Sequence, residues 1–238
     1  MSEQTPTIVL VHGAFAESAS WSPVVDLLQS RGLEVVAAAN PLRSLAGDAA
    51  YVRDVISSIG KPVVLVAHSY GGMVITEAAA HNDAVVGLVY VNGFAPEHGE
   101  SAFQLGAMFP GSTLAANAVA YPVSTGGNEF AIRQDAFHQQ FAADVPAAQA
   151  AVMAATQPPA TEAALSEPLP TDAPAWKHVP SWFVFGDQDL IIPVAVHRFM
   201  AERAGAKGSR ELAGASHALS VSEPDAVTAT IVDAVAGL

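Results

Sequence analysis

Short apolar segments and amphipathic segments alternate along the first 94 residues of the chain. The apolar segments are rich in β-branched residues and have the length of buried strands: 7–12, 33–39, 63–67 and 84–93. The segments between them carry apolar side chains at helical spacing: 20–32, 47–60 and 72–81. Strands that alternate with helices predict a doubly wound α/β layer, in which helices cover both faces of a parallel sheet.

This alternation stops after Phe94. The stretch 95–177 is rich in Ala, Pro and Gln, contains no convincing buried strand, and shows two short helical patterns within 136–156. A structureless loop of this length is uncommon in a compact domain. We therefore expect 95–177 to form an inserted, mainly helical cap subdomain.

The strand–helix alternation resumes in the C-terminal part of the chain. Two further strands and two helices are expected there: 181–186, 193–205, 209–214, and a last helix from 223 with Ser222 as its N-cap. Together with the N-terminal part, they predict an α/β core of about six mostly parallel strands, built from residues 1–94 and 178–238.

Composition narrows the classes of partner. The chain has 238 residues, of which 51% are hydrophobic, enough for a large core. Its net charge of −13 argues against nucleic acid or an anionic membrane as a partner. Cysteine is absent, which excludes disulfides and thiolate chemistry and is compatible with a reducing compartment. With no secretory signal and no apolar run of membrane-spanning length, we expect a cytoplasmic monomer or homodimer that acts on a small molecule.

The sequence "AHSYG" at residues 67–71 joins the third strand directly to a helix. A serine at the apex of such a turn lies at the carboxyl end of the sheet, where α/β proteins bind ligands, with its Oγ lifted clear of the backbone. Ser69 is therefore a candidate nucleophile. The alternative is an ordinary tight turn between strand and helix.

Serine needs a base to act as a nucleophile at neutral pH, and the base needs a carboxylate to orient it. His217 follows the last predicted strand in "AGASHALS", and Asp187 and Asp189 follow the previous strand in "FVFGDQDLIIP". The order serine, aspartate, histidine is the one expected when all three residues lie at strand ends of this sheet. The spacing leaves both aspartates open as the acid.

The first strand ends in "LVHGAF", which supplies candidate groups to stabilise an oxyanion. Gly13 allows the backbone to approach the serine closely. The backbone N–H groups of Ala14 and Tyr70 are then candidates for an oxyanion hole, and Phe15 for a pocket wall. His12 and His68 flank the site, and we expect them to be structural, bonded to backbone.

Four motifs of this chain resemble the α/β-hydrolase fold family: "LVHGAF" followed by Trp21, "AHSYGGM", "GDQDLIIP" and "GASHAL". The chain is similar in particular to the small cofactor-free group that holds plant methyl esterases, hydroxynitrile lyases and bacterial carboxylesterases. The resemblance implies Ser69 as nucleophile, His217 as base and Asp189, rather than Asp187, as acid, with no metal or organic cofactor. The lyases have a Lys where this chain has Ala218 and a Thr where it has Gly13, so both positions favour ester hydrolysis.

The sequence thus predicts a serine esterase that cleaves small to medium, fairly apolar carboxylic esters through an acyl-enzyme. Side chains of the cap are expected either to line its pocket or to pack onto the sheet: Phe103, Met108, Phe109, Phe137 and Phe141. The remaining histidines are too scattered to indicate a metal site: His81, His98, His138, His178 and His197. The alternatives are a carbon–carbon hydrolase or lyase, a cofactor-free oxygenase, and a non-catalytic small-molecule receptor.

Overall fold

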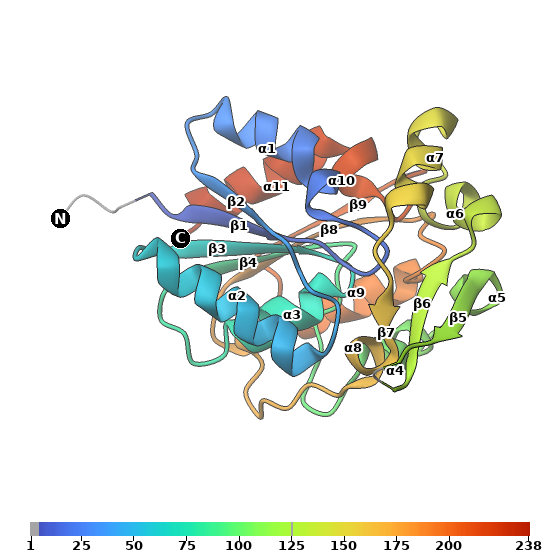
Figure 1. Cartoon of the computed structure of the whole chain (residues 1–238). Helices are drawn as coiled ribbons and strands as arrows, with labels where there is room; N and C mark the ends of the chain where they lie inside the picture. The colour runs from blue at the N-terminus through green and yellow to red at the C-terminus, as the bar shows by residue number, and fades with distance from the viewer. Residues whose placement is uncertain (1–4, 125) are drawn as a thin grey trace.

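Residues 5–124 and 126–238, the part of the chain that the computed structural model describes, are organised around a six-stranded sheet (Figure 1). Its strands in chain order are β1 (Thr7–Val11), β2 (Val35–Ala38), β3 (Val63–His68), β4 (Val85–Val91), β8 (Ser181–Gly186) and β9 (Gly208–Leu212). They are ordered β2-β1-β3-β4-β8-β9, and every pairing is parallel. The predicted parallel sheet is confirmed. Strand order reverses between β1 and β3, which is where α/β sheets form ligand crevices.

Helices cover both faces of this sheet because side chains along each strand alternate between the faces. Ile8 and Leu10 pack in one cluster with side chains of α1 (Ser22–Gln29) and α11 (Pro224–Ala236). Trp21, from the short helix η1 (Ser18–Trp21), belongs to the same cluster. Val9 and Val11 belong to the other cluster, which includes side chains of three helices: α2 (Leu45–Ile59), α3 (Gly71–Ala78) and α9 (Val194–Arg203). Within the described ranges, no helix combines the length and apolarity that crossing a bilayer requires.

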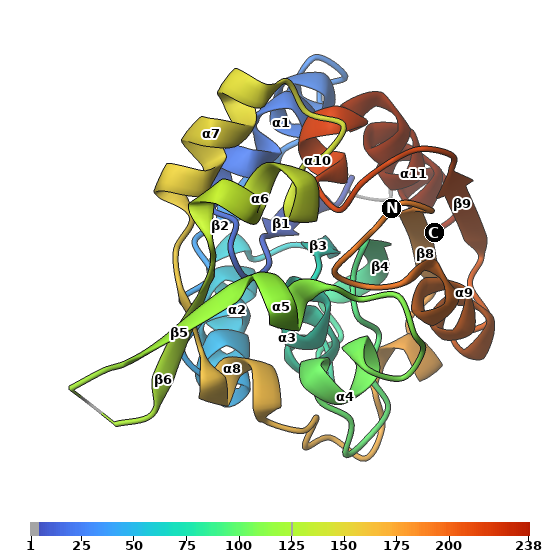
Figure 2. The same ribbon diagram turned by 90° about the vertical axis from the view of Figure 1, so that its right-hand side faces the viewer.

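Most of segment 95–177 lies over the carboxyl ends of the strands, and its last part returns to the start of β8 (Figures 1 and 2). Its elements are α4 (Ala102–Gly106), α5 (Leu114–Asn117), β5 (Ala118–Pro122), β6 (Asn128–Ile132), α6 (Gln134–Phe141), α7 (Ala147–Thr156), β7 (Ala160–Thr161), α8 (Glu162–Ser166) and η2 (Ala175–Lys177). Helices α6 and α7 match the two helical patterns. The antiparallel sheet β5-β6-β7 was not predicted. Strand β5 is largely exposed and β7 has two residues, so neither produces a buried apolar run.

The start of the last helix differs from the prediction. Ser222 ends a short helix, α10 (Leu219–Ser222), and its hydroxyl donates to the Ala218 carbonyl at 3.3 Å. Helix α11 begins at Pro224, with Glu223 as its N-cap. Proline fits the first turn of a helix because it lacks the N–H that would be unsatisfied there. It therefore sets the start of α11 one residue later than a Ser222 cap would.

Helix α3 starts so close to the loop after β4 that its second residue has room for glycine alone. A Cβ added at Gly72 would lie 2.1 Å from the carbonyl oxygen of Phe94 and 2.8 Å from its nitrogen. We expect Gly72→Ala to lower the free energy of unfolding by about 3 kcal/mol, because backbone has to move. Urea unfolding measures this. The control is Gly106→Ala, where the nearest atom is 3.8 Å away; equal stability of the two variants would contradict the prediction.

Candidate active site

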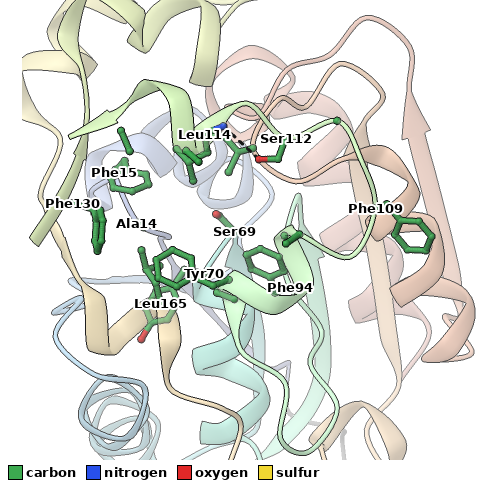
Figure 3. A pocket seen from close by; sticks show the side chains of 18 of the residues that line it. Ala14, Phe15, Ser69, Tyr70, Phe94, Phe109, Ser112, Leu114, Phe130 and Leu165 are labelled. Carbon is green, nitrogen blue, oxygen red and sulfur yellow. Dashed lines mark hydrogen bonds between the residues drawn. The ribbon is translucent and has the colours of Figure 1, made fainter. Parts of the chain in front are cut away.

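Ser69 occupies a strained turn between β3 and α3. Its φ is +53°, in the left-handed region that costs a non-glycine residue about 1–2 kcal/mol. Backbone hydrogen bonds hold the turn: Ser69 N–H donates to the Asn92 carbonyl at 3.1 Å, and the Ser69 carbonyl accepts from Gly72 and Phe94. The side chain lines a cavity, with its oxygen turned into it (Figure 3). Strain held by surrounding structure at a cavity wall is typical of functional positions.

The loop after β1 closely approaches this turn. A Cβ added at Gly13 would lie 2.6 Å from the Ser69 Cβ and 2.7 Å from the His68 carbonyl oxygen, so the predicted need for glycine is met. This approach places Ala14 at the wall of the same cavity, together with Tyr70. Among the described residues, neither the Ala14 N–H nor the Tyr70 N–H has a hydrogen-bond acceptor. Two backbone donors are thus available near the Ser69 hydroxyl.

Asp189 and His217 form a buried pair. Nδ1 of His217 lies 2.7 Å from Oδ2 of Asp189. The other carboxylate oxygen accepts from the N–H groups of Ile191 and Ile192 at 2.8 and 2.9 Å. Asp187 instead accepts from Gly214 N–H at 2.7 Å, on the loop after β9. Of the two candidate acids, Asp189 is the one whose carboxylate is within hydrogen-bond distance of the His217 ring.

Asn92 connects the His217 loop to the Ser69 turn. Its side-chain amide donates to the carbonyls of Ser216 and His217 at 2.9 and 3.0 Å, and its Oδ1 accepts from Gly186 N–H at 2.9 Å. Its own backbone carbonyl accepts from Ser69 N–H. One fully buried amide therefore joins strand ends that are distant in sequence. Sequence reasoning missed Asn92; the available signal was a polar residue directly after the apolar run of β4.

Segment 95–177 holds the same histidine from the other side. The Phe141 ring packs edge-on against the His217 ring, with centroids 4.9 Å apart. Asp144 accepts hydrogen bonds from the backbone N–H of Ser216, at 2.9 Å, and from its hydroxyl. Phe141 also stacks on Phe137. Both rings are buried in the core and do not line the cavity, which corrects the prediction that they are pocket residues.

The cavity beside Ser69 has a volume of about 690 Å³. Residues with aromatic side chains make up much of its lining: Phe15, Tyr70, Phe94, Phe103, Phe109 and Phe130. The Tyr70 hydroxyl is occupied, since it donates to buried Asp48 at 2.8 Å. The described residues that line the cavity include none with a charged side chain. The predicted residues Phe15, Phe103 and Phe109 are in this wall, whereas Met108 lies outside it and is 40% exposed.

Burial and charge set the protonation states around the site. Burial opposes ionisation of Asp189, but interaction with His217 and the hydrogen bonds from His197 and His217 outweigh it and hold the pKa of this carboxyl well below its usual range. Burial, together with the charge of His217, lowers the pKa of His68 well below that of a free histidine. Burial likewise lowers the pKa of His12. Both flanking histidines contact backbone carbonyls, His12 that of Gly13 and His68 that of His217.

Three buried histidines with lowered pKa values, His12, His68 and His197, predict a loss of stability in mild acid. Below about pH 6.5 the unfolded chain takes up more protons at these positions than the folded chain does, so the free energy of unfolding decreases as the pH decreases. The loss between pH 6.5 and 5.5 is expected to reach at most about 3 kcal/mol, roughly 1 kcal/mol for each histidine that stays neutral in the folded chain. Asp48, whose pKa burial raises, acts in the opposite direction and reduces this slope.

Urea unfolding at pH 7.5, 6.5 and 5.5 tests this prediction. His98→Asn is the control, because the His98 side chain is 53% exposed and its replacement leaves the three buried histidines in place. Equal free energies of unfolding at pH 6.5 and 5.5 would contradict it.

Comparisons with known proteins support the reading of the fold. A family model described as the alpha/beta hydrolase family matches residues 8–230. The pyrethroid hydrolase of Sphingobium wenxiniae is 27% identical over 251 residues, covering 95% of this chain and 86% of that protein. The carbendazim hydrolyzing esterase of Nocardioides sp. is 34% identical over 113 residues. This match covers 41% of this chain and 46% of that protein. The solved structure of polyneuridine aldehyde esterase has the same fold, with a TM-score of 0.82, 20% identity and coverage of 97% and 99% of the two chains.

Proposed function

Since this chain belongs to the alpha/beta hydrolase family, we propose that it is a serine esterase in which Ser69, His217 and Asp189 form the catalytic triad. One observation carries this proposal. Asp189 holds Nδ1 of His217, which leaves Nε2 as the open ring nitrogen, and Nε2 is buried without a hydrogen-bond partner in the described part of the chain. Asn92 joins the backbone of His217 to the backbone of the Ser69 turn, since it donates to the His217 carbonyl and accepts from Ser69 N–H.

The mechanism follows from these positions. An ionised Asp189 accepts only, so the proton of neutral His217 is on Nδ1 and Nε2 is free to act as a base. Ser69 Oγ attacks the ester carbonyl, and Nε2 takes its proton and then delivers it to the leaving alcohol. Asp189 stabilises the charged ring. Water, activated by the same nitrogen, releases the acid from the acyl-enzyme.

The developing oxyanion needs donors that are already in place. The N–H groups of Ala14 and Tyr70 have no competing acceptor among the described residues and flank the Ser69 turn. Preorganised donors of this kind contribute about 3 kcal/mol each to the stability of the transition state. Helix α3, which starts at Gly71, adds the positive end of its dipole at the same place.

The proposed substrate is a small to medium, uncharged and fairly apolar ester. The aromatic wall favours apolar groups, and the described residues of the lining provide no charged side chain to bind an ionic one. Phe103, Phe109 and Phe130 come from segment 95–177, in keeping with a cap subdomain over a core of residues 1–94 and 178–238. A cytoplasmic location, a monomer or homodimer, and the absence of nucleic-acid partners remain predictions.

A fluorophosphonate probe and a panel of esters test the proposal together. We expect the probe to label Ser69, as located by peptide mapping, and turnover to vary with the length of the acyl and alcohol parts. The absence of labelling would indicate a receptor rather than an enzyme. Labelling without turnover of any ester would favour a carbon–carbon hydrolase or lyase.

A further inference from the structure

A second imidazole contacts the carboxylate of Asp189. Nε2 of His197 lies 3.2 Å from Oδ2, the oxygen that also receives Nδ1 of His217. His197 comes from α9, eight residues after Asp189, and is fully buried. The carboxylate thus has four hydrogen-bond donors, two from the backbone and two from imidazoles.

The His197 ring also packs against an aromatic side chain. Its ring stacks on the Phe185 ring, with centroids 5.2 Å apart and planes 13° from parallel. Its Nδ1 is buried and has no hydrogen-bond partner in the ranges that the structure describes. An unsatisfied buried nitrogen destabilises the fold, so packing alone would favour an apolar residue at this position. The contact with Asp189 is the interaction that distinguishes histidine from such a residue.

The protonation state of His197 suits a donor to Asp189. Because a carboxylate only accepts, the ring hydrogen must be on Nε2. Burial lowers the pKa of His197, although Asp189 opposes the shift, so the ring is a neutral donor at neutral pH. A neutral donor restrains the carboxylate without adding a charge that would compete with a protonated His217.

We infer that His197 is a positioning residue of the hydrolytic site: its hydrogen bond fixes the Asp189 carboxylate in the orientation that His217 requires. The inference rests on the proposed function, in which Asp189 is the acid of the triad. His197 does not line the cavity. It therefore affects the reaction through Asp189 and His217, and not through contact with substrate.

Two substitutions of similar length separate the hydrogen bond from packing. His197→Gln retains an N–H donor, whereas His197→Met fills similar space without one. We expect His197→Met to lower kcat about tenfold with KM unchanged, the loss typical of one hydrogen bond to a charged group, and His197→Gln to stay within about threefold of the parent. His197→Phe, which keeps a ring on Phe185, serves as a second variant without a donor if His197→Met does not fold. Equal values of kcat in His197→Gln and the donor-free variant would overturn the inference.

Proton NMR provides a readout that does not depend on turnover. The Nδ1 hydrogen of His217, bonded to Asp189, is expected at low field in the parent and in His197→Gln, and shifted or broadened by exchange in the donor-free variant. The same resonance in all the proteins would overturn the inference. Fluorophosphonate labelling of the parent tests the proposed function separately: failure to label Ser69 with a His197-dependent NMR signal would refute the esterase and leave the hydrogen-bond role in place.

Discussion

Ser69→Ala is expected to lower the rate of ester hydrolysis by about six orders of magnitude, the loss typical when the nucleophile of a triad is removed. The remaining groups retain only binding and oxyanion stabilisation. The fold should be unaffected, because the hydroxyl makes no hydrogen bond to the described residues and alanine keeps the Cβ that the turn already accommodates. The measurement is kcat with p-nitrophenyl butyrate, alongside circular dichroism and thermal unfolding.

The control for Ser69→Ala is Ser209→Ala, purified in the same way. Ser209 is exposed on β9, away from the cavity, and its replacement should leave kcat within about twofold, as for a surface substitution. Undiminished hydrolysis by Ser69→Ala would exclude this residue as the nucleophile, and the proposed mechanism with it.

The second large effect is expected at the acid. Asp189→Asn should lower kcat by about four orders of magnitude, as when the aspartate of a triad becomes an amide. Its NH2 group can face Nδ1 of His217 and favour the ring tautomer that has the hydrogen on Nε2, where it cannot act as a base. Asp187→Asn is the matched control, two residues away. Its side-chain oxygen can still accept from Gly214 N–H, so we expect kcat within about threefold.

Comparison of the two variants decides the assignment. A greater loss of kcat in Asp187→Asn than in Asp189→Asn would make Asp187 the acid. It would also show that the pairing of Asp189 with His217 has another role. Both variants should be compared at pH 7 or above, because the lowered pKa of Asp189 keeps it ionised throughout that range.

The order of elements was predictable because buried strands and amphipathic helices differ in the period of their apolar residues. β3 and α3, for example, lie close to their expected positions, and the turn with Ser69 is between them. β5 and β6 were not predicted, since their side chains are mostly exposed or half-buried and carry little periodic signal. Short exposed strands depend on pairing with distant residues, which one sequence does not reveal.

The candidate site was predictable only where its chemistry requires an unusual residue at an unusual place. Ser69 and Gly13 meet that condition. Asn92 and His197 do not, since each is a single polar residue: the side-chain partners of Asn92 are 94 to 125 residues away in the chain, and Asp189 is eight residues from His197. Phe137 and Phe141 show a further limit. An aromatic residue in the sequence indicates a buried side chain but does not show which way the ring points. The sequence therefore could not show that these rings pack behind His217 instead of facing a substrate.

The positive φ of Ser69 also bears on how this protein can change over generations. Glycine adopts that backbone conformation without steric penalty, whereas serine does not. Folding and reactivity therefore select for different residues at one position, and only continued use of the reaction retains the hydroxyl. In a descendant lineage that no longer needed this reaction, replacement of Ser69 by glycine would be an early sign of lost catalytic activity, preceding other changes in the fold.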